Sequence, residues 1–427
     1  MPESPSTIPQ ARKSNDYFKM PRSPLLNHYE TEIKKSSGKK GLYLITDFLT
    51  KRVWSWMYYY LDSRFGKKHP YPDYANGETG IYSLRKSASS SDDYISLALA
   101  ADWATYTTES IRIADEIKKH SPDFTIHLGD TYYVGAPFEI NANFVETGSP
   151  WVRGSVGSFA ILGNHEMYAR GDAFFDKLLP ALGILDSAGK FDAQKAGFFC
   201  LENEHWRILG LDTGYHSIGR IPVFELFKWF APDCHFDKIL MRWLKEKLHL
   251  DDPLDKRGLL ILTHHQYITA FKGEDEYAVP ARQLAALIGT ERPVLWIWGH
   301  EHKLSIFEKA QLNNGVTAYG RCIGHGGMPV EVKSGSFRLS PSAGGYPHLV
   351  AVDDRVMLER DNVALGYNGY VLLKIKDNIL TIEYYDKEQM LFSETWRVDN
   401  NGVISGNILI TPECPLRPEK PWEEAVK

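Results

Sequence analysis

The chain has 427 residues, which is long enough for roughly two to three domains or for one large α/β domain with insertions, and with 43% hydrophobic residues it can form a large core. Its net charge of −5 argues against binding to bulk nucleic acid. The 4 cysteines show no CxxC spacing, which argues against a zinc knuckle and gives no sign of a disulfide framework.

The N-terminal region differs from the rest of the chain in being basic and aromatic. Residues 1–40 are rich in Ser, Pro and Lys, which is typical of a weakly structured arm. In residues 42–61, apolar and aromatic side chains recur at helical spacing, but charged residues interrupt the run, so a membrane span is not expected. This segment is either a helix packed on the main domain or a helix that docks to a membrane surface or a protein partner.

From residue 94 onward, strand-like and helix-like patterns alternate. Apolar runs predict strands at 94–100, 124–128, 158–162, 206–211, 259–262, 293–298, 369–376 and 379–385. The last two runs flank Asp377-Asn378 and predict a hairpin. Apolar residues at helical spacing predict helices at 108–120 and 238–250. This alternation favours an α/β domain.

Short polar motifs directly follow five of the strand-like runs. In chain order they are Ala101-Asp102-Trp103-Ala104, Gly129-Asp130-Thr131-Tyr132-Tyr133, Gly163-Asn164-His165-Glu166, Ile261-Leu262-Thr263-His264 and Gly299-His300-Glu301-His302. Because ligands of open α/β sheets bind beyond the carboxyl ends of the strands, we expect these motifs to converge on one crevice. Their carboxylate, phenol, amide and imidazole groups suit two adjacent transition-metal ions. The motifs therefore point to metal-assisted hydrolysis of a phosphate ester.

In these motifs, the chain resembles the calcineurin-like metallophosphoesterases, and most of all their purple acid phosphatase branch, from residue 94 to about residue 390. Most of that superfamily has a metal-binding His at the position of Ala104, whose side chain cannot bind a metal. Purple acid phosphatases also lack this His and use a Tyr three residues after the second Asp, which is the spacing of Tyr133 from Asp130. The resemblance implies a four-layer αββα sandwich of the α/β (α+β) class, in which two mixed β-sheets are flanked by helices.

The resemblance also divides the chain. Residues 94–400 are expected to form the metallophosphoesterase catalytic domain, between an N-terminal extension at 1–93 and a C-terminal tail at 401–427. The polar, Pro-rich N-terminus lacks the apolar run of a signal peptide, and no transmembrane segment is expected, so we predict a cytoplasmic protein.

Two metal positions that share Asp130 are implied by the resemblance. The ligands of the first would be Asp102, Asp130, Tyr133 and His302. The ligands of the second would be Asp130, Asn164, His264 and His300. Two carboxylates and a phenolate favour Fe(III) at the first position, whereas the neutral ligands of the second suit Zn, Mn or Fe(II). In the alternative interpretation, Tyr132 and Tyr133 only pack in their loop.

By the same resemblance, Asp130, His165 and His264 are the catalytic residues. His165 would face the substrate phosphate and assist the leaving group, as a general acid or by stabilising charge. The alternative is that His165 only supports the ligands through a hydrogen bond. Glu166 is expected to orient a neighbouring imidazole. His265 either reaches the substrate or has a structural role.

Other positions depart from the family pattern or stay ambiguous. Mammalian-type purple acid phosphatases have a further His that faces the substrate. This chain has Gly273 at that position, next to Lys272, so its preference for monoesters is left open. The Gly-rich segment 319–328 either approaches a ligand or forms a structural turn. The aromatic segment 214–237 either covers the pocket or is a packed insertion.

We therefore predict a binuclear-metal-dependent hydrolase of phosphate esters that acts on a small phosphorylated substrate, as a phosphomonoesterase of purple acid phosphatase type. One alternative is a phosphodiesterase that acts on nucleotides or lipid head groups, which the shared motifs do not distinguish. Another is a non-catalytic scaffold, against which the complete ligand set argues.

Overall fold

The computed structural model describes residues 67–75, 77–186, 189–218, 234–271, 275–311, 314–330, 332, 348–360 and 363–427. The predicted helix at 42–61 lies outside these ranges, as do Lys272, Gly273 and the middle of segment 214–237. Within the ranges, no helix is long and apolar enough to cross a membrane.

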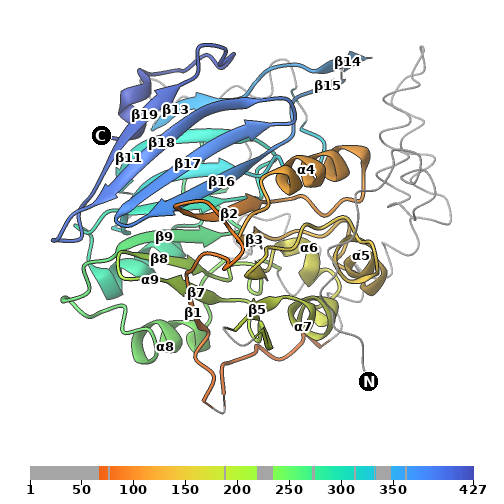
Figure 1. Ribbon diagram of the computed structural model, residues 1–427, viewed down its shortest axis with the longest axis vertical. Helices are drawn as coiled ribbons and strands as arrows, with labels where there is room; N and C mark the ends of the chain where they lie inside the picture. Colours follow the sequence, from red (N-terminus) through yellow and green to blue (C-terminus); the bar gives the residue numbers. More distant parts are fainter. Residues whose placement is uncertain are drawn as a thin grey trace.

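One of the two large sheets has eight strands and a parallel centre (Figure 1). In spatial order its strands are β1 (Ile81–Ser83), β7 (Phe199–Glu202), β8 (Trp206–Gly210), β9 (Gly258–Thr263), β10 (Val294–Trp298), β12 (Thr317–Ile323), β11 (Leu304–Gln311) and β13 (Leu349–Val352). Strands β8, β9, β10 and β12 run parallel to one another, whereas β11 is antiparallel to both of its neighbours. The sheet is therefore mixed.

The second large sheet has nine strands. Its order is β19 (Ile404–Ile410), β18 (Met390–Val398), β17 (Ile379–Asp386), β16 (Gly369–Lys376), β2 (Ile95–Ala100), β3 (Phe124–His127), β4 (Gly157–Ala160), β5 (Gly183–Leu185) and β6 (Phe191–Ala193). Strands β2, β3 and β4 are parallel, and the other pairs are antiparallel. Strands β14 (Leu358–Arg360) and β15 (Val363–Leu365) form a separate antiparallel pair.

The central strands are buried on both faces, which explains their almost continuous apolar runs. In β9, Leu260 and Leu262 belong to the apolar cluster between the two sheets, whereas Leu259 and Ile261 pack in the cluster under the helices. Successive side chains of a strand point to opposite faces, so each central strand contributes to two cores. The main core therefore lies between the two sheets.

Helices cover the outer face of each sheet. On the nine-stranded sheet they are α4 (Thr108–Lys119), α5 (Pro137–Ile140), η2 (Asn141–Val145), α6 (Asn164–Met167), η3 (Phe174–Leu178) and α7 (Leu179–Ala181). On the eight-stranded sheet they are α8 (Lys238–Glu246) and α9 (Ala278–Ile288). Short 3-10 helix η6 (Trp422–Ala425) lies near the C-terminus. The predicted four-layer sandwich is confirmed.

The two helices expected from sequence both form, and capping explains where they begin. The side chain of Thr107 accepts a hydrogen bond from the backbone of Ser110 at the start of α4. The side chain of Asp237 accepts one from Ile239 at the start of α8. Helix α8 ends at Glu246, four residues before the predicted end at 250.

Two segments from outside the predicted limits of 94 and 400 join the sheets. Strand β1 pairs with β7, and β19 pairs with β18. Ala425 and Val426 also lie in the core between the sheets, and the carbonyl of Ala425 accepts a hydrogen bond of 2.7 Å from Arg321. The C-terminal segment is thus part of the sandwich, because its apolar side chains close one edge of the core.

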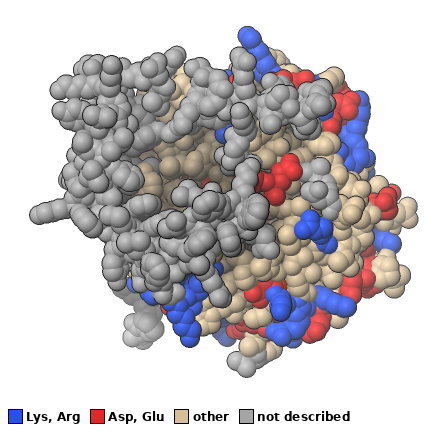
Figure 2. All heavy atoms as spheres, turned by 180° about the vertical axis from the view of Figure 1, so that it is seen from behind, with Lys and Arg blue, Asp and Glu red and all other residues tan. Residues whose placement is uncertain are grey.

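Charged side chains of both signs are mixed on the described surface. On the face shown in Figure 2, Lys and Arg alternate with Asp and Glu around the visible rim. Some charged side chains of the described surface are paired, as between Lys376 and Asp93 or Lys427 and Glu424. This distribution is typical of an ordinary solvated surface.

Candidate metal centre

Five loops at strand ends, three from one sheet and two from the other, bring the site together (Figure 1). In the nine-stranded sheet, β2, β3 and β4 lead to Asp102, Asp130 and Asn164. In the other sheet, β9 and β10 lead to His264 and His300. The strands are parallel within each group, so their carboxyl ends meet at one edge, as the sequence motifs indicated.

The backbone turns sharply at these strand ends. Asp102, Asp130 and His300 have φ angles of 54°, 70° and 65°, in the left-handed region that side-chain-bearing residues adopt rarely. Glycine is needed where the two carboxylates approach the backbone. A Cβ on Gly163 would lie 2.2 Å from Oδ1 of Asp130, and one on Gly299 would lie 2.6 Å from Oδ2 of Asp102.

The two carboxylates are buried and held by backbone amides. The exposed fraction is 0% for Asp102 and 1% for Asp130. The N–H of His300 donates to Oδ2 of Asp102 at 2.8 Å, and the N–H of His165 donates to Oδ1 of Asp130 at 2.9 Å. Each carboxylate therefore has its other oxygen, Oδ1 of Asp102 and Oδ2 of Asp130, directed toward the remaining site residues.

The phenol in this site belongs to Tyr132, whereas the sequence predicts Tyr133 there. The Tyr132 hydroxyl lies 2.8 Å from Oδ1 of Asp102, 3.1 Å from Oδ2 of Asp130 and 2.8 Å from Nε2 of His302. Burial and the two carboxylates raise its pKa well above the ordinary value. Its position favours Tyr132, in place of the expected Tyr133, as the phenol of the site.

Tyr133 contributes to the site through its backbone. Its carbonyl oxygen lies 2.5 Å from Nδ1 of His165, and its N–H donates to Glu139. Burial and the charge of Glu139 raise the pKa of the Tyr133 phenol. Tyr132 and Tyr133 lie in a turn, where consecutive side chains point in different directions, so the spacing of a motif does not decide which of two adjacent tyrosines turns inward.

His264 sits between two oxygen atoms of the predicted ligands. Its Nδ1 donates to the carbonyl of Leu128 at 2.8 Å, and its Nε2 lies 3.1 Å from Oδ1 of Asn164 and 3.3 Å from Oδ2 of Asp130. Since a carbonyl only accepts, the Nδ1 of His264 carries a proton and leaves Nε2 for a ligand, as in most metal-binding imidazoles.

The charges of the site shift the pKa values of its residues in opposite directions. Burial would raise the pKa of Asp130, but the imidazoles of His264 and His165 hold it well below the usual range. Burial would lower the pKa of His264, but the Asp130 carboxylate raises it to about 10. The Nε2 of His264 thus lies between two oxygen atoms, Oδ1 of Asn164 and Oδ2 of Asp130, in an arrangement that a metal ion fits.

Glu166 holds two of the loops together. Its Oε2 accepts hydrogen bonds from the backbone N–H groups of Asp130 at 3.1 Å and Gly163 at 2.9 Å. Burial and the charge of Asp130 raise its pKa to about 7. The expectation that Glu166 orients an imidazole is wrong, because its hydrogen-bonded oxygen is occupied by backbone amides of the second and third motifs.

His165 presents one ring nitrogen to the site. Its Nδ1 donates to the carbonyl of Tyr133, and its Nε2 lies 3.8 Å from Oδ2 of Asp130. The ring packs on Tyr132 with a centroid distance of 4.3 Å, and 20% of the side chain is exposed. Burial lowers the pKa of His165. The ring nitrogen Nε2 of His165 thus lies on the side of the site, near Asp130.

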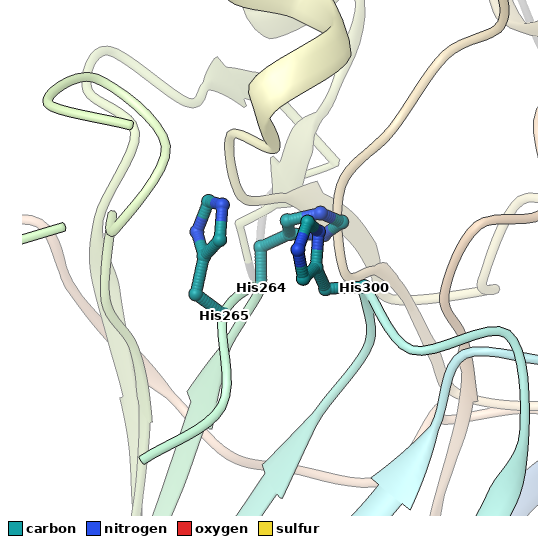
Figure 3. A group of neighbouring side chains, drawn as sticks. All are labelled: His264, His265 and His300. Atoms are coloured by element: carbon teal, nitrogen blue, oxygen red, sulfur yellow. The ribbon is translucent and has the colours of Figure 1, made fainter. Parts of the chain in front are cut away.

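His264 belongs to two overlapping groups of potential metal ligands. In each group, the ligand atoms lie within 4.8 Å of one another, and the two groups are Asp102, Asp130 and His264, and His264, His265 and His300. Burial and the charge of His264 lower the pKa of His300 to about 3, so this ring is neutral and can bind a metal ion. Because His264 belongs to both groups, two adjacent metal positions fit the site. Figure 3 shows the three imidazoles of the second group.

The Gly-rich segment 319–328 supports the first motif. The N–H of Gly326 donates to the carbonyl of Ala101 at 3.0 Å, and that of Met328 donates to the carbonyl of Asp102 at 2.9 Å. A Cβ on Gly327 would lie 2.3 Å from the carbonyl oxygen of Trp103. These contacts favour the structural interpretation of the segment, since its glycines face the protein backbone.

Comparison with known proteins supports the interpretation of these residues as a metal centre. Residues 95–304 match the family model of the calcineurin-like phosphoesterases. This domain is a calcineurin-like phosphoesterase. The family hydrolyses phosphate esters and uses a dinuclear metal centre, which is the centre that the carboxylates and imidazoles described above suit.

Solved structures that resemble this chain are distant. A purple acid phosphatase, PPD1, from yellow lupin (Lupinus luteus) seeds is 14% identical with a TM-score of 0.45, over 74% of this chain and 54% of that one. This chain thus spans about half of the lupin protein. GAP50, the anchor in the inner membrane complex of Plasmodium, is 11% identical with a TM-score of 0.41, over 72% and 89% of the chains. PhoD is 12% identical with a TM-score of 0.44, over 79% and 76%. A search of the curated proteins finds no significant match.

Proposed function

We propose that the chain is a binuclear-metal-dependent phosphomonoesterase of purple acid phosphatase type. The observation that supports this most is the phenol of Tyr132, whose hydroxyl lies 2.8 Å from Oδ1 of Asp102 and 2.8 Å from Nε2 of His302. A phenolate beside two carboxylates is a hard, anionic ligand set, which favours a trivalent ion such as Fe(III).

Each proposed metal position has its own ligands, and Asp130 is common to both. The first position takes Asp102, Asp130, Tyr132 and His302. The second takes Asp130, Asn164, His264 and His300, and these mostly neutral ligands suit Zn, Mn or Fe(II). Two bound ions would offset the charge of the phosphate and activate the attacking water.

The residues of the chain position the substrate around this centre. His165 fixes its Nδ1 on the carbonyl of Tyr133, so its Nε2 is free to donate a proton to the leaving-group oxygen. Burial lowers the pKa of His165, but a phosphate dianion beside Nε2 would favour the protonated ring. Glu166 keeps the loops of Asp130 and Gly163 together and thereby fixes the spacing of the ligands.

Metal binding at the first position is coupled to loss of a proton. Burial and the carboxylates of Asp102 and Asp130 raise the pKa of Tyr132, so without a metal ion its phenol stays protonated. A trivalent cation would reverse this effect by favouring the phenolate. We therefore expect binding of Fe(III) to release a proton and to give a visibly coloured protein.

The test of this function compares initial rates on p-nitrophenyl phosphate and bis-p-nitrophenyl phosphate, with Asp130→Asn as the control. We expect faster hydrolysis of the monoester and loss of activity in the control. Faster hydrolysis of the diester would overturn the proposal in favour of a phosphodiesterase acting on nucleotides or lipid head groups. A metal-loaded protein inert on both esters would favour a scaffold.

The remaining functional expectations stay predictions. They are a cytoplasmic location, the lack of nucleic-acid binding and docking to a membrane or protein through residues 42–61. Deletion of residues 1–60 tests the last of these, since docking requires catalysis to survive while binding to anionic liposomes or a partner is lost. Failure of the truncated chain to fold would favour packing of this segment on the domain.

A further inference from the structure

His265 lies beside the proposed second metal position, although the family ligands do not include it. Its ring centroid is 4.6 Å from that of His300 and 4.8 Å from that of His264. The rings of His264 and His300 meet edge-on with centroids 5.3 Å apart, and Figure 3 shows the ring of His265 to one side of them. The three imidazoles offer nitrogen atoms within 4.8 Å of one another.

The backbone of His265 is fixed on both sides. Its N–H donates to the hydroxyl of Thr213 at 3.1 Å, and its carbonyl accepts a hydrogen bond of 2.9 Å from the hydroxyl of Thr263. Its ring nitrogen Nδ1 lies 3.0 Å from the same Thr213 oxygen. When Nδ1 donates to this hydroxyl, the imidazole is oriented as in metal sites, where the other ring nitrogen binds the ion.

The other ring nitrogen of His265, Nε2, makes no hydrogen bond within the described part of the chain, although the residue is only 3% exposed. No group in that part of the chain therefore competes with a ligand for Nε2, and the ring is further held by contact with Tyr277 at a centroid distance of 5.2 Å. Binding of a metal ion would use Nε2.

We propose that His265 is a third imidazole ligand of the second metal position, together with His264 and His300. This inference rests on the proposed function and deepens it. Three imidazoles with Asn164 and the shared Asp130 make the position nitrogen-rich. Imidazole suits Zn and other late first-row ions, whereas Mn and Mg prefer oxygen ligands, so His265 selects Zn(II) over Mn(II) at this position.

Metal binding by His265→Ala tests the proposal, with His205→Ala as the matched control. His205 lies away from the site, and its Nε2 lies 2.9 Å from Oε1 of Glu204. The probe is Zn(II), titrated into metal-free protein in competition with a chromophoric chelator. We expect the second Zn(II) to bind His265→Ala more than about 100-fold more weakly, since loss of an outer hydrogen-bond partner alone costs about 10- to 100-fold.

Several outcomes would overturn the role of His265 as a ligand. Unchanged affinity for both ions in His265→Ala is one. Unchanged Zn(II) binding with weaker inhibition by inorganic phosphate is another, since it would assign His265 to the substrate. A wild-type protein that does not bind two ions contradicts the proposed function instead, so the two failures are distinguishable.

A crystal structure of the Zn-loaded wild-type protein is a second measurement that does not depend on whether the variant folds. The expected distance from Nε2 of His265 to the second ion is about 2.0–2.1 Å. A distance too long for coordination, with His264 and His300 bound to that ion, would overturn the proposal.

Discussion

Tyr132→Phe and Tyr133→Phe are matched variants, because each removes a single hydroxyl and the two positions are adjacent in the chain. The hydroxyl of Tyr132 touches Asp102, Asp130 and His302, whereas that of Tyr133 has none of these contacts. Only Tyr132→Phe should therefore change the metal centre.

The size of the effect follows from these contacts. The Tyr132 hydroxyl donates one hydrogen bond to a fully buried carboxylate, and a bond to a charged group contributes about 1.5–3 kcal/mol. We expect Tyr132→Phe to lower the free energy of unfolding of the metal-free protein by roughly that amount. Within the described residues the Tyr133 hydroxyl makes no hydrogen bond of this kind, so the cost of Tyr133→Phe should stay below about 1 kcal/mol.

Two assays read these outcomes independently. Urea unfolding of the metal-free variants gives the free energies, and the visible spectrum of the iron-loaded proteins reports the Fe(III)–phenolate bond. Tyr132→Phe should lose the visible band and Tyr133→Phe should keep it. The opposite pattern, or a colourless wild-type protein fully loaded with iron, would refute the assignment of Tyr132.

Three further variants test separate parts of the molecule. His165→Ala should lower turnover by about 10²- to 10⁴-fold while elemental analysis still finds both metal ions, and unchanged turnover would exclude its role. Burial raises the pKa of Asp212 to about 7, so the folded state favours the protonated acid, and the resulting stability is complete below about pH 4 and declines until about pH 7. Between pH 5 and pH 8 the wild type should therefore lose about 2–3 kcal/mol more unfolding free energy than Asp212→Asn, and equal losses would contradict this. Nε of Arg321 lies 2.9 Å from Oε1 of Glu394 between the sheets, and Arg321→Met leaves this carboxylate buried without its partner. Urea unfolding should show that the free energy of unfolding falls by about 3–5 kcal/mol. A decrease of less than about 1 kcal/mol would contradict a stabilising buried ion pair.

The position of the site could be predicted from sequence because it depends on topology. Apolar runs locate the strands, and Asp102, Asp130 and His264 each follow such a run. Parallel neighbours in a sheet bring their carboxyl ends together, so convergence follows without any knowledge of side-chain contacts. The sandwich fold followed from the resemblance that the same motifs carry.

The choice of Tyr132 over Tyr133 could not be predicted, because spacing identifies a loop and not the direction of each side chain within it. The role of Glu166 depends on a loop-to-loop contact with the backbone of Asp130 that sequence patterns do not encode. Strand β19 escaped prediction because Ser, Gly and Asn interrupt its apolar residues, and only its register with β18 shows that it is an edge strand.

Titration of the metal-free protein with metal ions tests the binuclear centre most directly, with bound metal and hydrolysis of p-nitrophenyl phosphate followed in the same samples. We expect two ions per chain, with activity that appears only as the second position fills, and loss of both properties in Asp130→Asn. Full activity with one bound ion, or activity that survives Asp130→Asn, would contradict a catalytic centre in which two metal ions share this carboxylate.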